Sequence, residues 1–177
     1  MKVVAFGAST STTSINKKLA AYAASLAGGS ATEILDLNDF EIPLFSEDKE
    51  KEIGQPEAAA RFLERLGTAD YLIISFAEHN GAYSAAYKNL FDWCTRINPK
   101  VFQSKPILLL STSPGGRGGK SVLELATNAI PRFGGDVRAS LSIPNFYENF
   151  DIDRLELSNT ELKAELVSSI AKLISVD

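Results

Sequence analysis

Five short apolar runs alternate with longer segments of helical periodicity along the chain. The runs, several of them almost continuous in hydrophobicity, lie at residues 2–7, 31–37, 70–77, 106–113 and 136–144. Such continuity is typical of strands that helices cover on both faces of a sheet. Helical patterns occupy residues 14–27, 56–67, 82–96, 120–134 and 158–175. This alternation predicts an α/β fold with a five-stranded parallel sheet and right-handed crossovers.

Start and stop signals support this division of the chain. Ser14 is expected to cap the first helix, Pro56 to take the first position of the second, and the last helix to open with a capping box from Ser158 to Glu161. Pro131 should kink or end the fourth helix near residue 130, because proline lacks the N–H that a helix interior uses.

Composition limits what the chain can do. Its 177 residues, 45% hydrophobic and 23% charged, suit a single domain over residues 1–177. The formal charge of −4 gives no general reason to bind nucleic acid or an acidic membrane, so small-molecule partners are favoured. The apolar stretch at residues 1–10 is too short for a secretory signal or a membrane span. Residues 38–55 are predicted to form a long acidic loop, with residues 47–52 as a solvated surface.

The single cysteine, Cys94, excludes an internal disulfide framework. Together with the single histidine, His79, it is too little for a Cys/His metal site. A reducing cytoplasm fits this composition, and Cys94 is expected to be a buried small hydrophobic residue.

The stretch from Ser111 to Val122 contains Gly-Lys-Ser and invites comparison with the phosphate loop of NTPases. Pro114 stands where the first glycine of that loop belongs, and Gly115 is one residue too close to Gly119. No apolar strand ending in a metal-binding Asp is found elsewhere, so the pattern argues against an NTPase. The glycines after this strand therefore need another explanation.

In an open parallel sheet, ligands bind beyond the carboxyl ends of the strands, where the strand order reverses. Three loops are expected there, at residues 7–16, 76–83 and 111–119. The first holds six consecutive hydroxyl residues, 9–14, that run into a helix N-terminus. Hydroxyls, loop N–H groups and the positive end of a helix together suit a phosphate monoester, whereas an N-cap followed by a polar turn is the alternative.

Motifs in these three loops resemble those of the NAD(P)H-dependent FMN reductase family. The second loop is similar to its "PEYNG" turn, with a following helix similar to "KNAIDW" at residues 88–93. The first loop is similar to "GSLRxxSxN" and the third to "SPGxxGG". The resemblance implies FMN-binding residues Ser9, Ser11, Ser14, Ile15, Asn16, Ala77, Glu78, His79, Asn80, Gly81, Ser113, Pro114, Gly115, Gly116 and Gly118.

The resemblance also implies a flavodoxin-like three-layer sandwich with strand order 2-1-3-4-5. NADPH or NADH would deliver hydride to the flavin N5, and a quinone, azo compound, flavin or metal oxyanion would accept the electrons. The family further implies a cytoplasmic homodimer or homotetramer. Because the chemistry resides on FMN, no side chain is assigned as a catalytic residue. The third loop would approach the flavin ring through its glycines.

Three departures from the family pattern affect these expectations. Ser11 stands where arginine is common, so a charge-assisted bond to phosphate is missing; Ala77 replaces proline and His79 replaces tyrosine. Ser11 and Ala77 keep one alternative open, a nucleotide-binding regulatory module with weakened flavin binding. A flavodoxin-type electron carrier that binds FMN is a second alternative. Phe91 and Trp93 are expected in the core or at a subunit interface.

Overall fold

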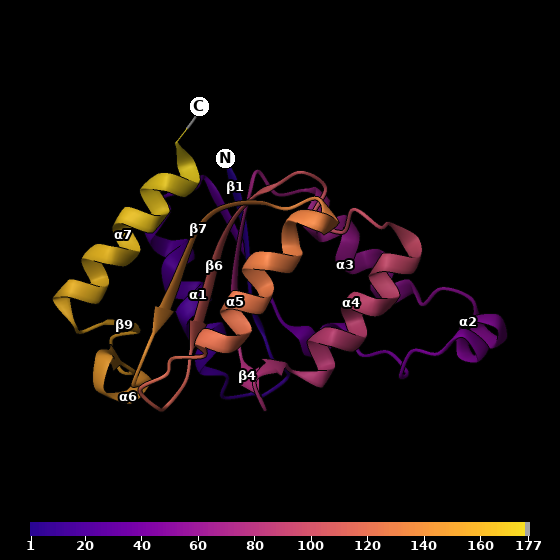
Figure 1. Cartoon of the computed structure of the whole chain (residues 1–177). Coiled ribbons are helices and arrows are strands. Elements are labelled where there is room, and N and C mark those ends of the chain that lie inside the picture. Colours follow the sequence, from indigo (N-terminus) through magenta and orange to yellow (C-terminus); the bar gives the residue numbers. More distant parts are fainter. Residues whose placement is uncertain (176–177) are drawn as a thin grey trace.

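The five apolar runs form one parallel sheet in the computed structural model, which describes residues 1–175 (Figure 1). The strands are β1 (Lys2–Ala8), β2 (Ala31–Leu35), β3 (Tyr71–Phe76), β6 (Pro106–Thr112) and β7 (Asp136–Ile143). Their order across the sheet is β2-β1-β3-β6-β7, and every neighbouring pair is parallel. The predicted order 2-1-3-4-5 is confirmed, with β6 and β7 as its fourth and fifth strands.

Helices cover both faces of this sheet (Figure 1). One layer contains α1 (Ile15–Leu26) and α7 (Thr160–Ile174), and the other contains α3 (Glu57–Gly67), α4 (Ala85–Ile97) and α5 (Lys120–Ala129). Side chains alternate between the layers along each strand. Val3 and Ala5 of β1 pack against the α1 layer, whereas Val4 and Phe6 pack against the other layer.

Helix starts follow the predicted capping chemistry only in part. Ser14 caps α1, because its Oγ accepts a hydrogen bond of 3.1 Å from the Lys17 N–H. Pro56 was placed one residue too far into α3: it is the N-cap, with extended ψ of 135°. The predicted Ser158–Glu161 capping box is wrong, since the Asn159 side chain accepts from two N–H groups at the start of α7.

Other boundaries follow from proline and from turn residues. Pro131 falls in the 3-10 helix η2 (Ile130–Phe133) that follows α5, so the predicted end of the helix near residue 130 is confirmed. The helix predicted from residue 82 instead begins at Ala85, after the N-cap Ser84. The preceding residues form a hairpin of β4 (Glu78–His79) and β5 (Ala82–Tyr83).

Residues 38–55 are not the continuous loop that was predicted. They contain most of the 3-10 helix η1 (Leu37–Phe40) and all of α2 (Glu47–Ile53). The Ser46 Oγ caps α2 by accepting from the Lys49 N–H at 3.0 Å. No side chain of α2 is buried, so the expected solvated surface is confirmed in helical form.

After β7 the chain forms α6 (Phe146–Asn149) and a small hairpin of β8 (Phe150–Asp151) and β9 (Glu156–Leu157). Phe146, Phe150 and Leu157 of this segment are buried against the α1 and α7 layer. Within residues 1–175, no helix has the length and apolar character needed to cross a membrane.

Candidate functional site

The three predicted loops meet in one cleft of about 240 Å³ at the carboxyl ends of β1, β3 and β6. Ten of the predicted residues line it, namely Ser9, Ser11, Ser14, Ile15, Asn16, Ala77, Glu78, His79, Ser113 and Pro114. Thr112 and Tyr147 also line it and were not predicted, and so does Thr13, which belongs to the hydroxyl run at residues 9–14 predicted to bind phosphate. The parallel sheet therefore gathers segments that lie far apart in the sequence around one opening.

The first loop turns sharply so that it presents unpaired donors. The Ser9 N–H bonds to the Gly7 carbonyl at 2.8 Å, and the Ser11 N–H bonds to the Ser9 Oγ at 3.1 Å. In contrast, the N–H groups of Thr13 and Ile15 have no acceptor among residues 1–175. These N–H groups, the loop hydroxyls and the positive end of the α1 dipole provide a suitable environment for a phosphate group.

Gly7 allows this loop to form, because α1 passes very close to the end of β1. A Cβ at this position would lie 2.4 Å from the Lys17 backbone nitrogen, a distance that real side chains do not show. The glycine therefore sets the close approach of the α1 N-terminus to the sheet, and with it the position of the donors.

Asn16 links the start of α1 to the ends of β3 and β6 beneath the cleft. Its Oδ1 accepts from the Ser75 hydroxyl at 2.7 Å and from the Thr112 N–H at 3.1 Å. Its Nδ2 donates to the Thr112 carbonyl at 3.2 Å, and the residue is only 3% exposed. Asn16 lines the cleft as predicted, but these hydrogen bonds brace α1 against β3 and β6 and leave few of its groups for a ligand.

The second loop is the β4–β5 hairpin, and only its first strand faces the cleft. Asn80 and Gly81 form the turn, with left-handed φ values of 53° and 78°, and both are exposed outside the cleft lining. The Glu78 Oε2 accepts from the Val122 N–H at 3.1 Å, near the start of α5. Glu78 thereby links the second loop to the helix that follows the third, where a carboxylate is favoured by the helix dipole.

The third loop is shaped by hydrogen bonds within the protein. The Gly115 carbonyl accepts from the Gly118 N–H at 3.2 Å and from the Ser113 hydroxyl at 3.1 Å. The Gly118 carbonyl accepts from the Ser111 and Ser142 hydroxyls at 2.7 and 2.9 Å. Gly115, Gly116 and Gly118 lie outside the cleft lining.

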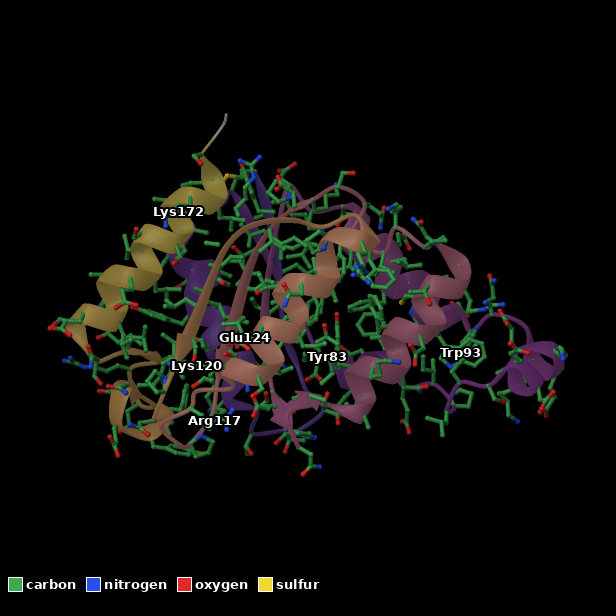
Figure 2. All side chains as sticks on the ribbon, in the orientation of Figure 1. Tyr83, Trp93, Arg117, Lys120, Glu124 and Lys172 are labelled. Carbon is green, nitrogen blue, oxygen red and sulfur yellow. The ribbon has the colours of Figure 1, made fainter. Side chains whose placement is uncertain are left out.

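Packing accounts for one of these glycines directly. Gly118 has a φ of 59°, and a Cβ there would lie 2.4 Å from the Ser142 Oγ. Arg117 donates to the Ser121 Oγ at 2.8 Å and is exposed next to Lys120, at the start of α5 (Figure 2). Neither cation lines the cleft.

The electrostatics of the cleft are close to neutral. Among its described lining residues there is no lysine or arginine, and its ionisable side chains are Glu78, His79 and Tyr147. Lys17 lies one turn into α1 but forms an ion pair with Asp36, whose pKa it lowers through this hydrogen bond. An anion in the cleft would therefore be held by hydroxyls, N–H groups and the helix dipole.

Trp93 and Cys94 of α4 are both buried inside the protein. Trp93 is fully buried, and its Nε1 donates to the Pro43 carbonyl at 2.8 Å, on the side of α4 toward α2 (Figure 2). A subunit-interface position for Trp93 is thus wrong. Cys94 is buried as expected, and desolvation raises the pKa of its thiol to about 12. Within residues 1–175, no cluster of His, Cys, Asp or Glu could hold a metal ion.

Residues 1–147 match the family described as NADPH-dependent FMN reductase. The chain belongs to this family. Members of the family bind FMN and use NAD(P)H. The match extends from β1 to the second residue of α6, so it includes all three loops of the cleft.

Individual relatives agree with the family assignment. The "Uncharacterized protein MG342 homolog" of Mycoplasma pneumoniae is 31% identical over 143 residues, which cover 78% of this chain and 84% of that protein. The "NAD(P)H-dependent FMN reductase PA1204" of Pseudomonas aeruginosa is 34% identical over 90 residues, which cover 51% of this chain and 47% of that protein. The chain thus aligns with about half the length of this named FMN reductase.

Solved structures share the fold. The flavoenzyme FerB, an NAD(P)H:(acceptor) oxidoreductase from Paracoccus denitrificans, superposes with a TM-score of 0.75 at 23% identity. The superposition covers 97% of this chain and 94% of FerB. At this identity the similarity establishes the flavodoxin-like α/β fold of the chain.

Proposed function

We propose that this protein is an NAD(P)H-dependent flavoprotein reductase that holds FMN in the cleft formed by the three loops. The observation that carries the proposal is the convergence of these loops at the ends of β1, β3 and β6, with unpaired N–H groups at the start of α1. Membership of the FMN reductase family supports the same assignment.

The residues of the cleft fit the chemical groups of FMN. The hydroxyls of Ser9, Ser11 and Thr13, with the N–H groups at the α1 N-terminus, would hold the phosphate without a full positive charge. Ala77, Ser113 and Pro114 lie at the ends of β3 and β6, where they would border the flavin ring. Asn16 and Glu78 hold these segments at fixed positions relative to one another.

FMN, when bound, would supply the redox chemistry, namely hydride acceptance from NAD(P)H at N5 and two-electron transfer to an acceptor. With a quinone the overall reaction is NAD(P)H, one proton and quinone giving NAD(P)⁺ and hydroquinone. The protein binds and orients the reactants, and its backbone and hydroxyl donors stabilise the phosphate and ring edge. Quinones, azo compounds, free flavins and metal oxyanions are the proposed acceptor classes.

The absence of a cation from the described cleft lining favours one second candidate, a nucleotide-binding regulatory module with weak flavin affinity. The visible absorption spectrum of the purified protein, recorded before and after anaerobic addition of NADPH or NADH, separates the candidates. Flavin bands that bleach rapidly support the reductase. Bands that persist indicate an electron carrier, and a protein that neither carries nor binds FMN would contradict every flavoprotein assignment.

We also propose that the protein works in the cytoplasm as a homodimer or homotetramer. Phe91 is only partly buried and packs on Phe133 at a ring distance of 4.7 Å, so apolar surface remains at the α4–α5 side for a subunit contact. Light scattering coupled to size-exclusion chromatography gives the mass in solution, and a monomer at micromolar concentration would contradict this part of the proposal.

A further inference from the structure

Tyr147 is an aromatic side chain at the cleft that belongs to none of the three loops. It lies on α6, lines the cleft together with His79 and Pro114, and is 61% exposed. Single exposed aromatic residues are common on protein surfaces and need no explanation by themselves. Tyr147, however, lies at the opening of the proposed active site, where its ring can contact a bound molecule.

The backbone that carries Tyr147 is held firmly against the third loop. The Asn145 N–H donates to the Gly115 carbonyl at 3.0 Å, and the Phe146 N–H donates to the Ser113 carbonyl at 3.0 Å. The Asn149 side chain donates to the Pro144 carbonyl at 2.8 Å and so joins the two ends of the segment that contains Tyr147.

Buried packing fixes the same segment. Phe146 is fully buried and stacks on Phe150 with a centroid distance of 4.6 Å, while Tyr147 meets Phe146 edge to face at 5.5 Å. Tyr147 is therefore an exposed ring on an ordered support. A ring in this situation can bury surface against a ligand at a low cost in conformational entropy.

We propose that Tyr147 is a specificity-determining residue that stacks on the ring of a planar aromatic acceptor, such as a quinone. The inference rests on the proposed function, because the acceptor must bind beside FMN. Tyr147 belongs to none of the loops that would hold FMN, and it keeps most of its surface in solvent at the edge of the cleft. Its exposed ring is therefore available to a molecule that binds at the opening of the cleft.

The other aromatic ring among the described lining residues is His79 of β4. Two flat side chains from separate elements thus border a cleft whose described lining has no cation. Such a rim favours planar, uncharged rings, which gain from offset stacking on flat side chains. Quinone reduction to hydroquinone consumes the two electrons of NAD(P)H and two protons, one of them supplied by solvent.

The test compares 1,4-naphthoquinone with ferricyanide, a compact anionic acceptor that offers no aromatic ring. The variants are Tyr147→Ala, Tyr147→Phe and, as a control, Ile152→Ala, which removes an apolar side chain of 43% exposure from the neighbouring hairpin outside the cleft. Loss of a stacked ring should raise the KM for naphthoquinone roughly 3- to 10-fold in Tyr147→Ala. Tyr147→Phe and Ile152→Ala should behave like wild type, and ferricyanide reduction should be unchanged.

A binding measurement without turnover accompanies the kinetics. Equilibrium dialysis of naphthoquinone against the oxidised, FMN-loaded protein should show the same loss of affinity in Tyr147→Ala alone. An unchanged affinity, an equal loss for ferricyanide, or a weakened FMN Kd in this variant would overturn the inference. Failure of the proposed function looks different, because the wild-type protein would then show no bleaching by NAD(P)H.

Discussion

Replacing Asn16 by alanine tests whether one buried amide holds the start of α1 against the ends of β3 and β6. The change removes hydrogen bonds from Asn16 to the Ser75 hydroxyl and to both backbone groups of Thr112, and these partners are at most 1% exposed. Each buried polar group left without a partner costs about 1–3 kcal/mol, so three such groups predict a loss of at least about 3 kcal/mol in the free energy of unfolding.

Urea unfolding followed by circular dichroism measures this loss. At a slope of about 2 kcal/mol per molar urea, the midpoint should fall by at least about 1.5 M. Ser75→Ala is the matched control, since it removes one partner and should cost about 1 kcal/mol. In the double variant this cost should vanish, because Asn16 and Ser75 act on the same hydrogen bond.

A loss of less than about 1 kcal/mol in Asn16→Ala, or full additivity of the costs of the two single variants, would refute this role of Asn16. Either result would mean that water or a rearranged α1 terminus satisfies the groups that Asn16 now bonds. A second consequence can be measured on the same protein. The FMN Kd should rise in Asn16→Ala, since the N-terminus of α1 would no longer be fixed relative to β3 and β6.

Three further predictions concern single side chains. Ser11→Arg should tighten FMN binding roughly 5- to 30-fold, because a charge-assisted hydrogen bond to phosphate is about 1–2 kcal/mol stronger than a neutral one. Unchanged affinity in a fluorescence titration would count against the phosphate-binding role of the first loop. Cys94, with its pKa raised to about 12, should resist Ellman's reagent at pH 8 until urea unfolds the protein, and rapid native modification would contradict its burial. Lys17 lowers the pKa of Asp36 below 3.8, so Asp36→Asn should be less stable than wild type at pH 7. This difference in stability should shrink as the pH falls through the lowered pKa of Asp36. Urea midpoints at pH 7 and pH 3 that show the same difference would contradict the ion pair.

The sheet could be predicted from the sequence because its three central strands, β1, β3 and β6, are buried along almost their whole length. Such runs admit few interpretations, and right-handed crossovers together with the family resemblance then give the strand order. The ends of the helices were harder to predict, because neighbouring polar residues can each serve as the N-cap. Ser158 and Asn159 are both good N-caps, and only the path of the chain after β9 decides that Asn159 caps α7.

Two elements were missed although the sequence carries their signals. Asn80 and Gly81 form the two-residue turn of the β4–β5 hairpin, and Asn-Gly is the commonest pair in such turns. Ser46 and Gly54 bracket α2 as N-cap and C-cap, yet its many charges resemble those of a loop.

The candidate site was also predicted only in part. Hydroxyl-rich and glycine-rich loops could be assigned to the cleft from their motifs, but which residues face the cleft depends on turn geometry. Gly118 is an example: its place in the motif predicts contact with a ligand, whereas in the structure Ser142 of β7 occupies the space beside its Cα. Tyr147 carries no sequence signal, because α6 is too short to show periodicity and lies far along the chain from the three loops.

Helix α2 stands away from both layers of the sandwich (Figure 1). It contributes no buried side chain and is tied to the body through groups such as Glu50, which pairs with Arg96 at 3.0 Å. It can therefore unfold while the sheet and both cores stay intact. Its amide hydrogens should exchange with solvent through local opening, at rates that low urea does not alter, whereas those of β3 and β6 require global unfolding. The same independence makes the segment a suitable place to insert a tag or label without disturbing the cleft.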